Sequence, residues 1–191
     1  MHSSHSVVSI LIVAALVVPT VSLASDKAEA TGNTCGFSSR IIFLESAPRD
    51  RFTVQNTSSG NWSITRVNLD LSSSAGNLIF DVTADGAGVE VYQPYRSENG
   101  EAKLSQQPVV VDGDQIIELS FSRFSPGDKH QFSIDIDDQL SESELGQIRV
   151  SGGEITGAAI IVAVTNRDGE EHVVSSVFDE TNKATLEGGS C

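Results

Sequence analysis

The sequence predicts an all-β fold, a single domain that is an antiparallel β-sandwich or a jelly-roll-like variant of one. Three observations support this prediction. Apolar and polar residues alternate with a period of two over many short segments, turn-forming residues follow these segments, and no long stretch has helical periodicity. The spacing of the turn signals indicates about nine or ten strands.

Residues 1–24 are typical of a signal peptide. Their apolar core runs from Val7 to Val18 and ends at Pro19, and Ser22-Leu23-Ala24 offers small residues at the cleavage positions. The residues before the core include no Lys or Arg, so an N-terminal membrane anchor is the alternative. We therefore expect a secreted protein, either extracellular or periplasmic.

The part of the chain after the signal peptide is acidic. Residues 25–34 are polar and indicate a disordered lead-in, which leaves residues 35–191 for the β-sandwich. A formal net charge of −14 argues against nucleic acid and anionic membrane surfaces as partners, because both attract basic surfaces. The same charge suits divalent cations, although it also serves solubility alone. We expect no membrane insertion after cleavage, because the longest later apolar run, residues 157–164, has the length of a strand.

The first strand signals lie between residues 51 and 71. Residues 51–55 alternate strictly, and the turn formers of residues 56–61 end that strand. Within residues 62–71 the apolar positions change from even to odd numbers. A change of parity inside one strand predicts a bulge near Thr65 and Arg66.

The middle of the chain adds shorter strands. Residues 78–82 alternate, and residues 89–92 form a brief apolar pattern. Residues 109–111 and 117–121 are separated by the turn Asp112-Gly113-Asp114, which predicts a β-hairpin.

The last third of the chain continues in the same way. Residues 132–137 alternate, which places Phe132, Ile134 and Ile136 inside and Ser133, Asp135 and Asp137 toward solvent. Residues 157–164 are apolar on both parities, as in a central strand covered on both faces, and residues 173–178 form a returning strand. The one helix candidate is residues 141–147, with Ser141 as its N-cap.

Asp135, Asp137 and Asp138 form the clearest candidate site, a site for a calcium ion. Period-two geometry places Asp135 and Asp137 on one strand face, about 7 Å apart. Two carboxylates at that separation repel each other, and a hard cation that prefers oxygen ligands relieves the repulsion. The alternative is a solvated acidic edge that discourages aggregation between strands. Asp70 and Asp81 join such a site only if the fold brings them near.

No set of residues points to catalysis. His130 and His172 lie in predicted strands without metal-ligand spacing, so each is expected at a strand surface. No Gly-x-Ser-x-Gly motif is present. We therefore expect a protein that is not an enzyme. The rival hypothesis, a hydrolase on a jelly-roll scaffold, requires His130 or His172 in a cleft beside carboxylates or a serine.

The chain has two cysteines, Cys35 and Cys191. Export to an oxidising compartment allows a disulfide bond between them. On the chain-entropy account, closing so long a loop stabilises the fold by roughly 4–5 kcal/mol. A free thiol and a bridge to a second subunit are the alternatives.

Trp62, Tyr92 and Tyr95 are the candidate contact residues. Trp62 is the only tryptophan, and it is expected either in the core or as an exposed platform for a sugar ring. Tyr92 and Tyr95 precede residues 96–107, the longest expected loop and the expected contact surface. A carbohydrate-binding module is the alternative function, and it requires these aromatic residues to be exposed on a shallow face.

Several stretches of strand and turn residues carry a resemblance to a known family. They are Phe52-Thr53-Val54-Gln55-Asn56-Thr57-Ser58, Trp62-Ser63-Ile64 leading to Leu69-Asp70-Leu71, Leu78-Ile79-Phe80-Asp81, Phe124-Ser125-Pro126-Gly127-Asp128, Phe132-Ser133-Ile134-Asp135-Ile136-Asp137 and Gly157-Ala158. In these stretches the chain resembles the core protein of marine sponge aggregation factors and its secreted bacterial relatives.

The resemblance implies extracellular adhesion and assembly into a multimeric core, with calcium accompanying the adhesion. We therefore expect a secreted, non-catalytic domain whose partners are copies of itself, other extracellular proteins or glycans. An exposed strand edge or residues 96–107 would pair with another copy and give a homo-oligomer. Ca²⁺ is the one cofactor that this expectation includes.

Overall fold

The computed structural model describes residues 36–45, 49–89 and 91–188. The predicted signal peptide, the predicted lead-in and both cysteines, Cys35 and Cys191, lie outside the described residues. In the described part of the chain, no helix is long and apolar enough to cross a membrane.

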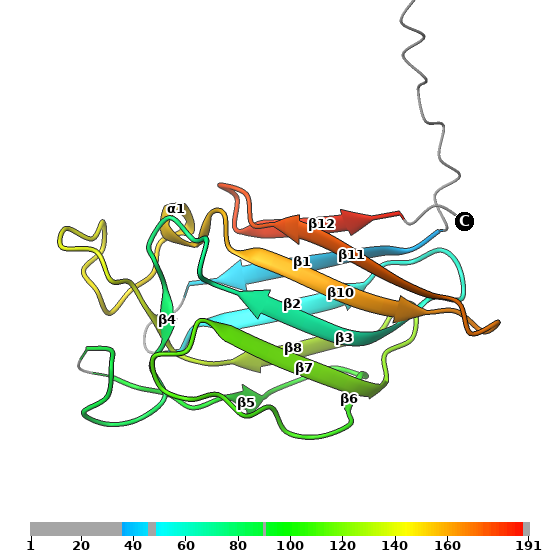
Figure 1. The fold of residues 1–191 in the computed structure, drawn as a ribbon, viewed down its shortest axis with the longest axis horizontal. Helices are drawn as coiled ribbons and strands as arrows, with labels where there is room; N and C mark the ends of the chain where they lie inside the picture. Colours follow the sequence, from blue (N-terminus) through cyan, green and yellow to red (C-terminus); the bar gives the residue numbers. More distant parts are fainter. Residues whose placement is uncertain (1–35, 46–48, 90, 189–191) are drawn as a thin grey trace, which may run out of the picture. The chain divides into compact units, whose positions relative to one another are not determined.

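Two five-stranded antiparallel sheets form the domain (Figure 1). The first sheet has the strand order β12 (Lys183–Glu187), β1 (Ser38–Leu44), β2 (Arg51–Asn56), β8 (Lys129–Ser133) and β5 (Arg96–Ser97). The second has the order β11 (Glu171–Val177), β10 (Ala159–Thr165), β3 (Ser63–Asp70), β7 (Ile116–Arg123) and β6 (Lys103–Leu104). A small separate pair consists of β4 (Ile79–Phe80) and β9 (Ile136–Asp137). The prediction of a single all-β sandwich domain is confirmed.

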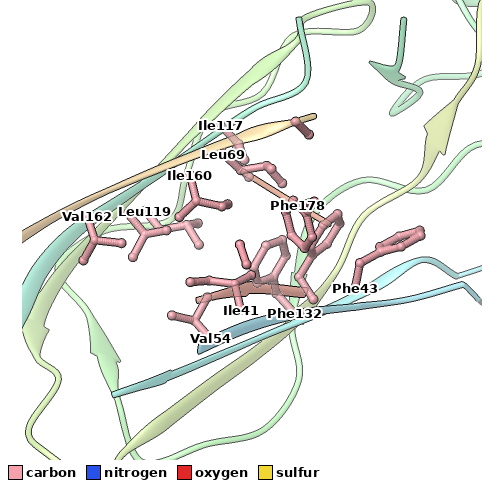
Figure 2. Packing of buried hydrophobic residues seen from close by; sticks show 14 of the residues in the cluster. Ile41, Phe43, Val54, Leu69, Ile117, Leu119, Phe132, Ile160, Val162 and Phe178 are labelled. Carbon is pink, nitrogen blue, oxygen red and sulfur yellow. The ribbon is translucent and has the colours of Figure 1, made fainter. Parts of the chain in front are cut away.

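Alternating apolar residues hold the two sheets face to face, because each strand buries every second side chain. Phe52 of β2 is fully buried among aromatic rings, with its ring centroid 5.1 Å from those of Phe43 and Phe132 and 6.3 Å from that of Phe178. Figure 2 shows the side chains of the two sheets pointing toward one another, among them Ile41, Val54, Leu69, Leu119, Ile160 and Val162.

The predicted change of parity in β3 is a β-bulge. Arg66 lies opposite Ala163 of β10, and Ile64 lies opposite Val164, so Thr65 is the extra residue. The bulge shifts the buried positions of β3 from even to odd numbers. The prediction of a bulge near Thr65 and Arg66 is confirmed.

Two of the predicted short strands are wrong. In the segment predicted as residues 89–92, the described residues form no strand, because Val91 N bonds locally to Val89 O at 2.8 Å. Residues 109–111 form no strand, and β7 pairs with β3 and β6 instead. The predicted hairpin is therefore absent, although its turn forms at Asp112-Gly113.

The predicted helix at residues 141–147 is also wrong, and a helix lies further along the chain as α1 (Gly152–Ile155). Ser151 and Glu154 form a capping box at its start. The Glu154 carboxylate also accepts hydrogen bonds from Ser143 Oγ and Glu144 N, both at 3.1 Å, which attach the segment predicted as a helix to α1.

Two predictions about burial are wrong as well. β10 is covered on one face only, and Ile161 on its other face remains 38% exposed. Ser133, Asp135 and Asp137, expected to face solvent, are buried. β8 ends at Ser133, and the chain then turns to pair β9 with β4, which withdraws the two aspartates from water.

Candidate functional site

Five buried aspartates gather at the end of the sandwich where β4 pairs with β9, on the left in Figure 1. We call them the aspartate cluster: Asp50 directly before β2, Asp81 directly after β4, and Asp135, Asp137 and Asp138 in and beside β9. All three predicted ligands, Asp135, Asp137 and Asp138, thus lie in or beside β9, and Asp50 and Asp81 join them from distant parts of the chain.

Backbone hydrogen bonds place these segments side by side. Asp81 N donates to Asp135 O at 3.1 Å, Gln93 N donates to Asp81 O at 3.1 Å, and Asp135 N donates to Gln93 O at 3.0 Å. Asp50 is attached in the same way, because its carbonyl oxygen accepts from Ile134 N at 3.1 Å. The fold therefore fixes the positions of the cluster through its main chain.

The carboxylates of the cluster are withdrawn from water and incompletely hydrogen-bonded. Asp81 and Asp135 are each 3% exposed, Asp137 is 1% exposed and Asp138 is fully buried. One carboxylate oxygen of each of these four residues has no hydrogen-bond partner among the described residues. A buried, unpartnered carboxylate oxygen is costly, because it has lost its hydration without replacement.

Burial raises the pKa of three cluster carboxylates above their ordinary value of 3.8. The pKa of Asp135 rises to about 8, that of Asp137 to about 7 and that of Asp81 to about 6. Removal from water is the largest cause in each case, because it disfavours the charged form. Repulsion from neighbouring aspartates adds to it, with Asp50 acting on Asp135 and Asp112 acting on Asp81.

Asp112 anchors a loop against the cluster. Its Oδ1 accepts from Val82 N at 2.8 Å and Thr83 N at 3.0 Å, and its Oδ2 accepts from Ala87 N. Desolvation raises the pKa of Asp112, but these backbone hydrogen bonds outweigh it and lower the pKa overall. Asp112 is therefore an ionised residue that fixes the course of residues 82–88.

Gly88 brings the backbone of that loop into contact with the cluster. A Cβ atom at this position would collide with Oδ2 of Asp137 and Oδ2 of Asp81. The next residue, Val89, donates its N–H to Asp137 Oδ2 at 2.6 Å. The two carboxylates thus converge on one stretch of backbone, and only glycine leaves them room.

Two observations restrict which side chains can bind a cation and how. Asp70 does not join the cluster, because it lies in β3 and its Oδ1 accepts from Ser72 N at 2.9 Å. In the positions that the side chains occupy, no three Asp, Glu, His or Cys groups of the described ranges could hold a metal ion together. Binding of a cation therefore requires cluster carboxylates to rotate toward one another.

The three aromatic candidates for a contact surface are separated by the fold. Trp62 is 4% exposed, as expected of a core residue, and its ring packs edge-on against His172. Tyr95 is half-buried, and its hydroxyl lies 2.8 Å from His130 Nε2. Tyr92 alone is exposed, at 47%. The three residues therefore form no common platform for a sugar ring.

Replacing Tyr95 with phenylalanine is expected to lower the free energy of unfolding by about 1 kcal/mol, because it removes the partly buried hydrogen bond to His130. Urea denaturation measures this difference. Tyr92→Phe is the matched control, because the exposed Tyr92 hydroxyl makes no hydrogen bond to another described residue, and it should leave the unfolding free energy unchanged. A Tyr95→Phe variant as stable as wild type would contradict the role given to this contact.

The two histidines lie in different surroundings. His130, expected at a strand surface, is instead buried, with ring centroids 5.2 Å from Phe121 and 5.8 Å from Phe132. Burial lowers its pKa to about 4. His172 lines a shallow groove together with Ser120 and Glu171, but no hydrogen bond between His172 and either residue occurs in the described part of the chain.

The fold and the site define an acidic antiparallel β-sandwich with a cluster of buried aspartates at one end. Comparison of the chain with protein-family models, with curated proteins and with solved structures finds no match. The proposals that follow therefore depend on the sequence and the geometry of this chain.

Proposed function

We propose that this chain is a secreted, non-catalytic adhesion domain that associates with a second copy of itself through an exposed segment, Pro108–Val111. One observation carries the proposal: the segment is apolar, it exposes alternate side chains as a strand does, and it belongs to neither sheet. Val109 is 88% exposed and Val111 is 61% exposed, whereas Val110 between them packs against the core.

The backbone groups of Val109 and Val110 are available for pairing. No backbone hydrogen bond joins residues 106–110 to another residue in the part of the chain that the structure describes. Val111 bonds only within its own turn, to Asp114. An exposed segment with unpaired N–H and C=O groups is a surface on which another strand can add.

A second copy suits this segment because antiparallel pairing about a two-fold axis is self-complementary. With Val110 opposite Val110 of the second copy, Val109 of each chain lies opposite Val111 of the other. Asp112 then lies opposite Pro108, so no two carboxylates face each other. β-branched side chains directly opposite one another stabilise such a pair.

The association is expected to be weak and to strengthen with salt. Two chains that each carry a net charge of −14 repel each other over long range, and salt screens that repulsion. Sedimentation velocity of the purified protein over a wide range of concentration and salt tests this expectation. We expect a sedimentation coefficient that rises with concentration, and rises further at high salt.

The variant Val109→Lys tests the surface itself, because a charge at this position opposes pairing without touching the core. It should sediment as a monomer at every concentration and keep the wild-type circular dichroism spectrum. Val173→Lys, at an exposed valine of β11, is the matched control and should associate as wild type does. A wild-type chain that stays monomeric throughout, or a Val109→Lys variant that associates equally, would overturn the proposal.

A further inference from the structure

We propose that Asp81, Asp135 and Asp137 bind a divalent cation, and that Ca²⁺ is the ion that this end of the sandwich selects. The inference is independent of self-association, because it concerns side chains within one chain. It extends the candidate ligands from the residues of one strand to Asp81, which belongs to a different part of the sequence.

The unpartnered oxygens of the cluster are the observation that points to a ligand. Asp81 Oδ1, Asp135 Oδ2 and Asp137 Oδ1 are buried and have no hydrogen-bond partner among the described residues. Their carboxylates lie on adjoining segments, since Asp81 and Asp135 are joined through their backbones and Asp81 and Asp137 both contact Gly88. A bound cation would supply the partner that each oxygen lacks.

No ion pair reaches the three proposed ligands. The ion pairs of the described residues all involve arginines, which pair with Glu45, Glu98, Glu118 and Asp128, and none of them includes Asp81, Asp135 or Asp137. Main-chain donors compensate only in part, for example Val89 N to Asp137 Oδ2 and Leu140 N to Asp138 Oδ1 at 2.9 Å. Several buried carboxylates without a counter-charge oppose folding unless a cation or protons neutralise them.

The donor set favours Ca²⁺ over other divalent ions. The cluster presents carboxylate oxygens and no thiolate or imidazole, which disfavours Zn²⁺ and Cu²⁺. Ca²⁺ accepts six to eight oxygens in flexible geometry, whereas Mg²⁺ demands a near-ideal octahedron. The carboxylates come from separate segments and must rotate to meet an ion, so they do not present the rigid octahedron that Mg²⁺ requires.

Asp50 and Asp138 have supporting roles in this proposal. Asp50 Oδ2 accepts a hydrogen bond from Ile136 N at 3.4 Å, and Asp138 Oδ1 is held by Leu140 N. Both residues therefore keep carboxylates beside the three ligands, where their charge attracts a cation.

Calorimetric titration of the chelator-treated protein with CaCl₂, together with thermal unfolding, tests the inference. We expect saturable binding, and at a hundredfold excess of free Ca²⁺ over its Kd a rise in Tm of roughly 5–10 °C. MgCl₂ at the same concentration should raise the Tm less. The double variant Asp135→Asn/Asp137→Asn should show no saturable binding and no more Tm shift than ionic strength alone produces.

The matched control removes the same amount of charge elsewhere. Asp168→Asn/Glu180→Gln alters two exposed side chains, so it should bind Ca²⁺ as wild type does. Equal Tm shifts in wild type and the Asp135→Asn/Asp137→Asn variant, or no saturable heat with wild type, would overturn the inference. Should the double variant fail to fold, Asp81→Asn provides the same comparison. Val109→Lys should bind Ca²⁺ normally, so failure of this site and failure of self-association are distinguishable.

Discussion

In the presence of a chelator, the free energy of unfolding of this protein is expected to fall by several kcal/mol as the pH rises toward 8. The pKa values of Asp135 and Asp137 are raised from 3.8 to about 8 and about 7, so the folded state holds protons that the unfolded state has released. Stability falls with pH wherever the folded state binds more protons. This loss of stability is absent below pH 3.8, where the two aspartates are protonated in both the folded and the unfolded state. It is complete above pH 8, where they are ionised in both states.

His130 acts in the opposite direction and restricts the useful pH range. Its pKa is lowered from 6.5 to about 4 by burial, so the unfolded state binds the extra proton as the pH falls below 6.5. As the pH falls from 6.5 to 4, His130 therefore lowers the free energy of unfolding, whereas protonation of the cluster aspartates raises it. Between pH 6.5 and pH 8 only the cluster contributes to the trend.

Guanidinium denaturation at several pH values in that range, with chelator and with CaCl₂, measures this effect. Ca²⁺ should flatten the profile, because the cation replaces the protons that the carboxylates lose. The Asp135→Asn/Asp137→Asn variant should be less pH-dependent than wild type and more stable than it in chelator at pH 8. A wild-type stability that stays constant or rises from pH 6.5 to pH 8 in chelator would contradict the account.

Part of the candidate site could be predicted from the period of the strand. Asp135 and Asp137 differ by two positions, so a shared face followed from strand geometry. Their burial did not follow, because alternating carboxylates normally face solvent. The contribution of Asp81 depends on the pairing of β4 with β9, a long-range contact that no local pattern encodes. Asp50 carries no local signal either, since it is a lone aspartate between two arginines.

The same limits apply to the strands. β2 and β7 alternate cleanly and were predicted, whereas β1 was not named. In β1 the buried face includes the polar Ser39, and the apolar Leu44 is 54% exposed. Apolar and polar residues therefore do not alternate regularly along this strand. β12 buries only Ala184 and Leu186, which is too short an alternation to stand out. Residues 109–111 show the reverse error, because strong β-propensity marks a segment that no neighbouring strand pairs with.

Replacing Gly88 with alanine is expected to weaken Ca²⁺ binding by roughly 10–100-fold, the range seen when groups that orient metal ligands are altered. The new Cβ would occupy the space of Asp137 Oδ2 and Asp81 Oδ2. Both are ends of side chains rather than backbone atoms, so the carboxylates can swing away while the strands keep their positions. The change should therefore act on affinity far more than on the fold.

Calorimetric titration of Gly88→Ala with CaCl₂ measures this loss, and the circular dichroism spectrum reports whether the sheets are retained. Gly153→Ala is the matched control, because a Cβ there meets nothing closer than 3.6 Å and its φ is not in the left-handed region. It should bind Ca²⁺ with wild-type affinity. If Gly88→Ala also bound Ca²⁺ as wild type does, the ion would not lie between Asp81 and Asp137, and the ligands would have to be sought among Asp50, Asp135 and Asp138. Because the two glycine variants add the same single methyl group, any difference between them reports the location of the site rather than the general effect of losing a glycine.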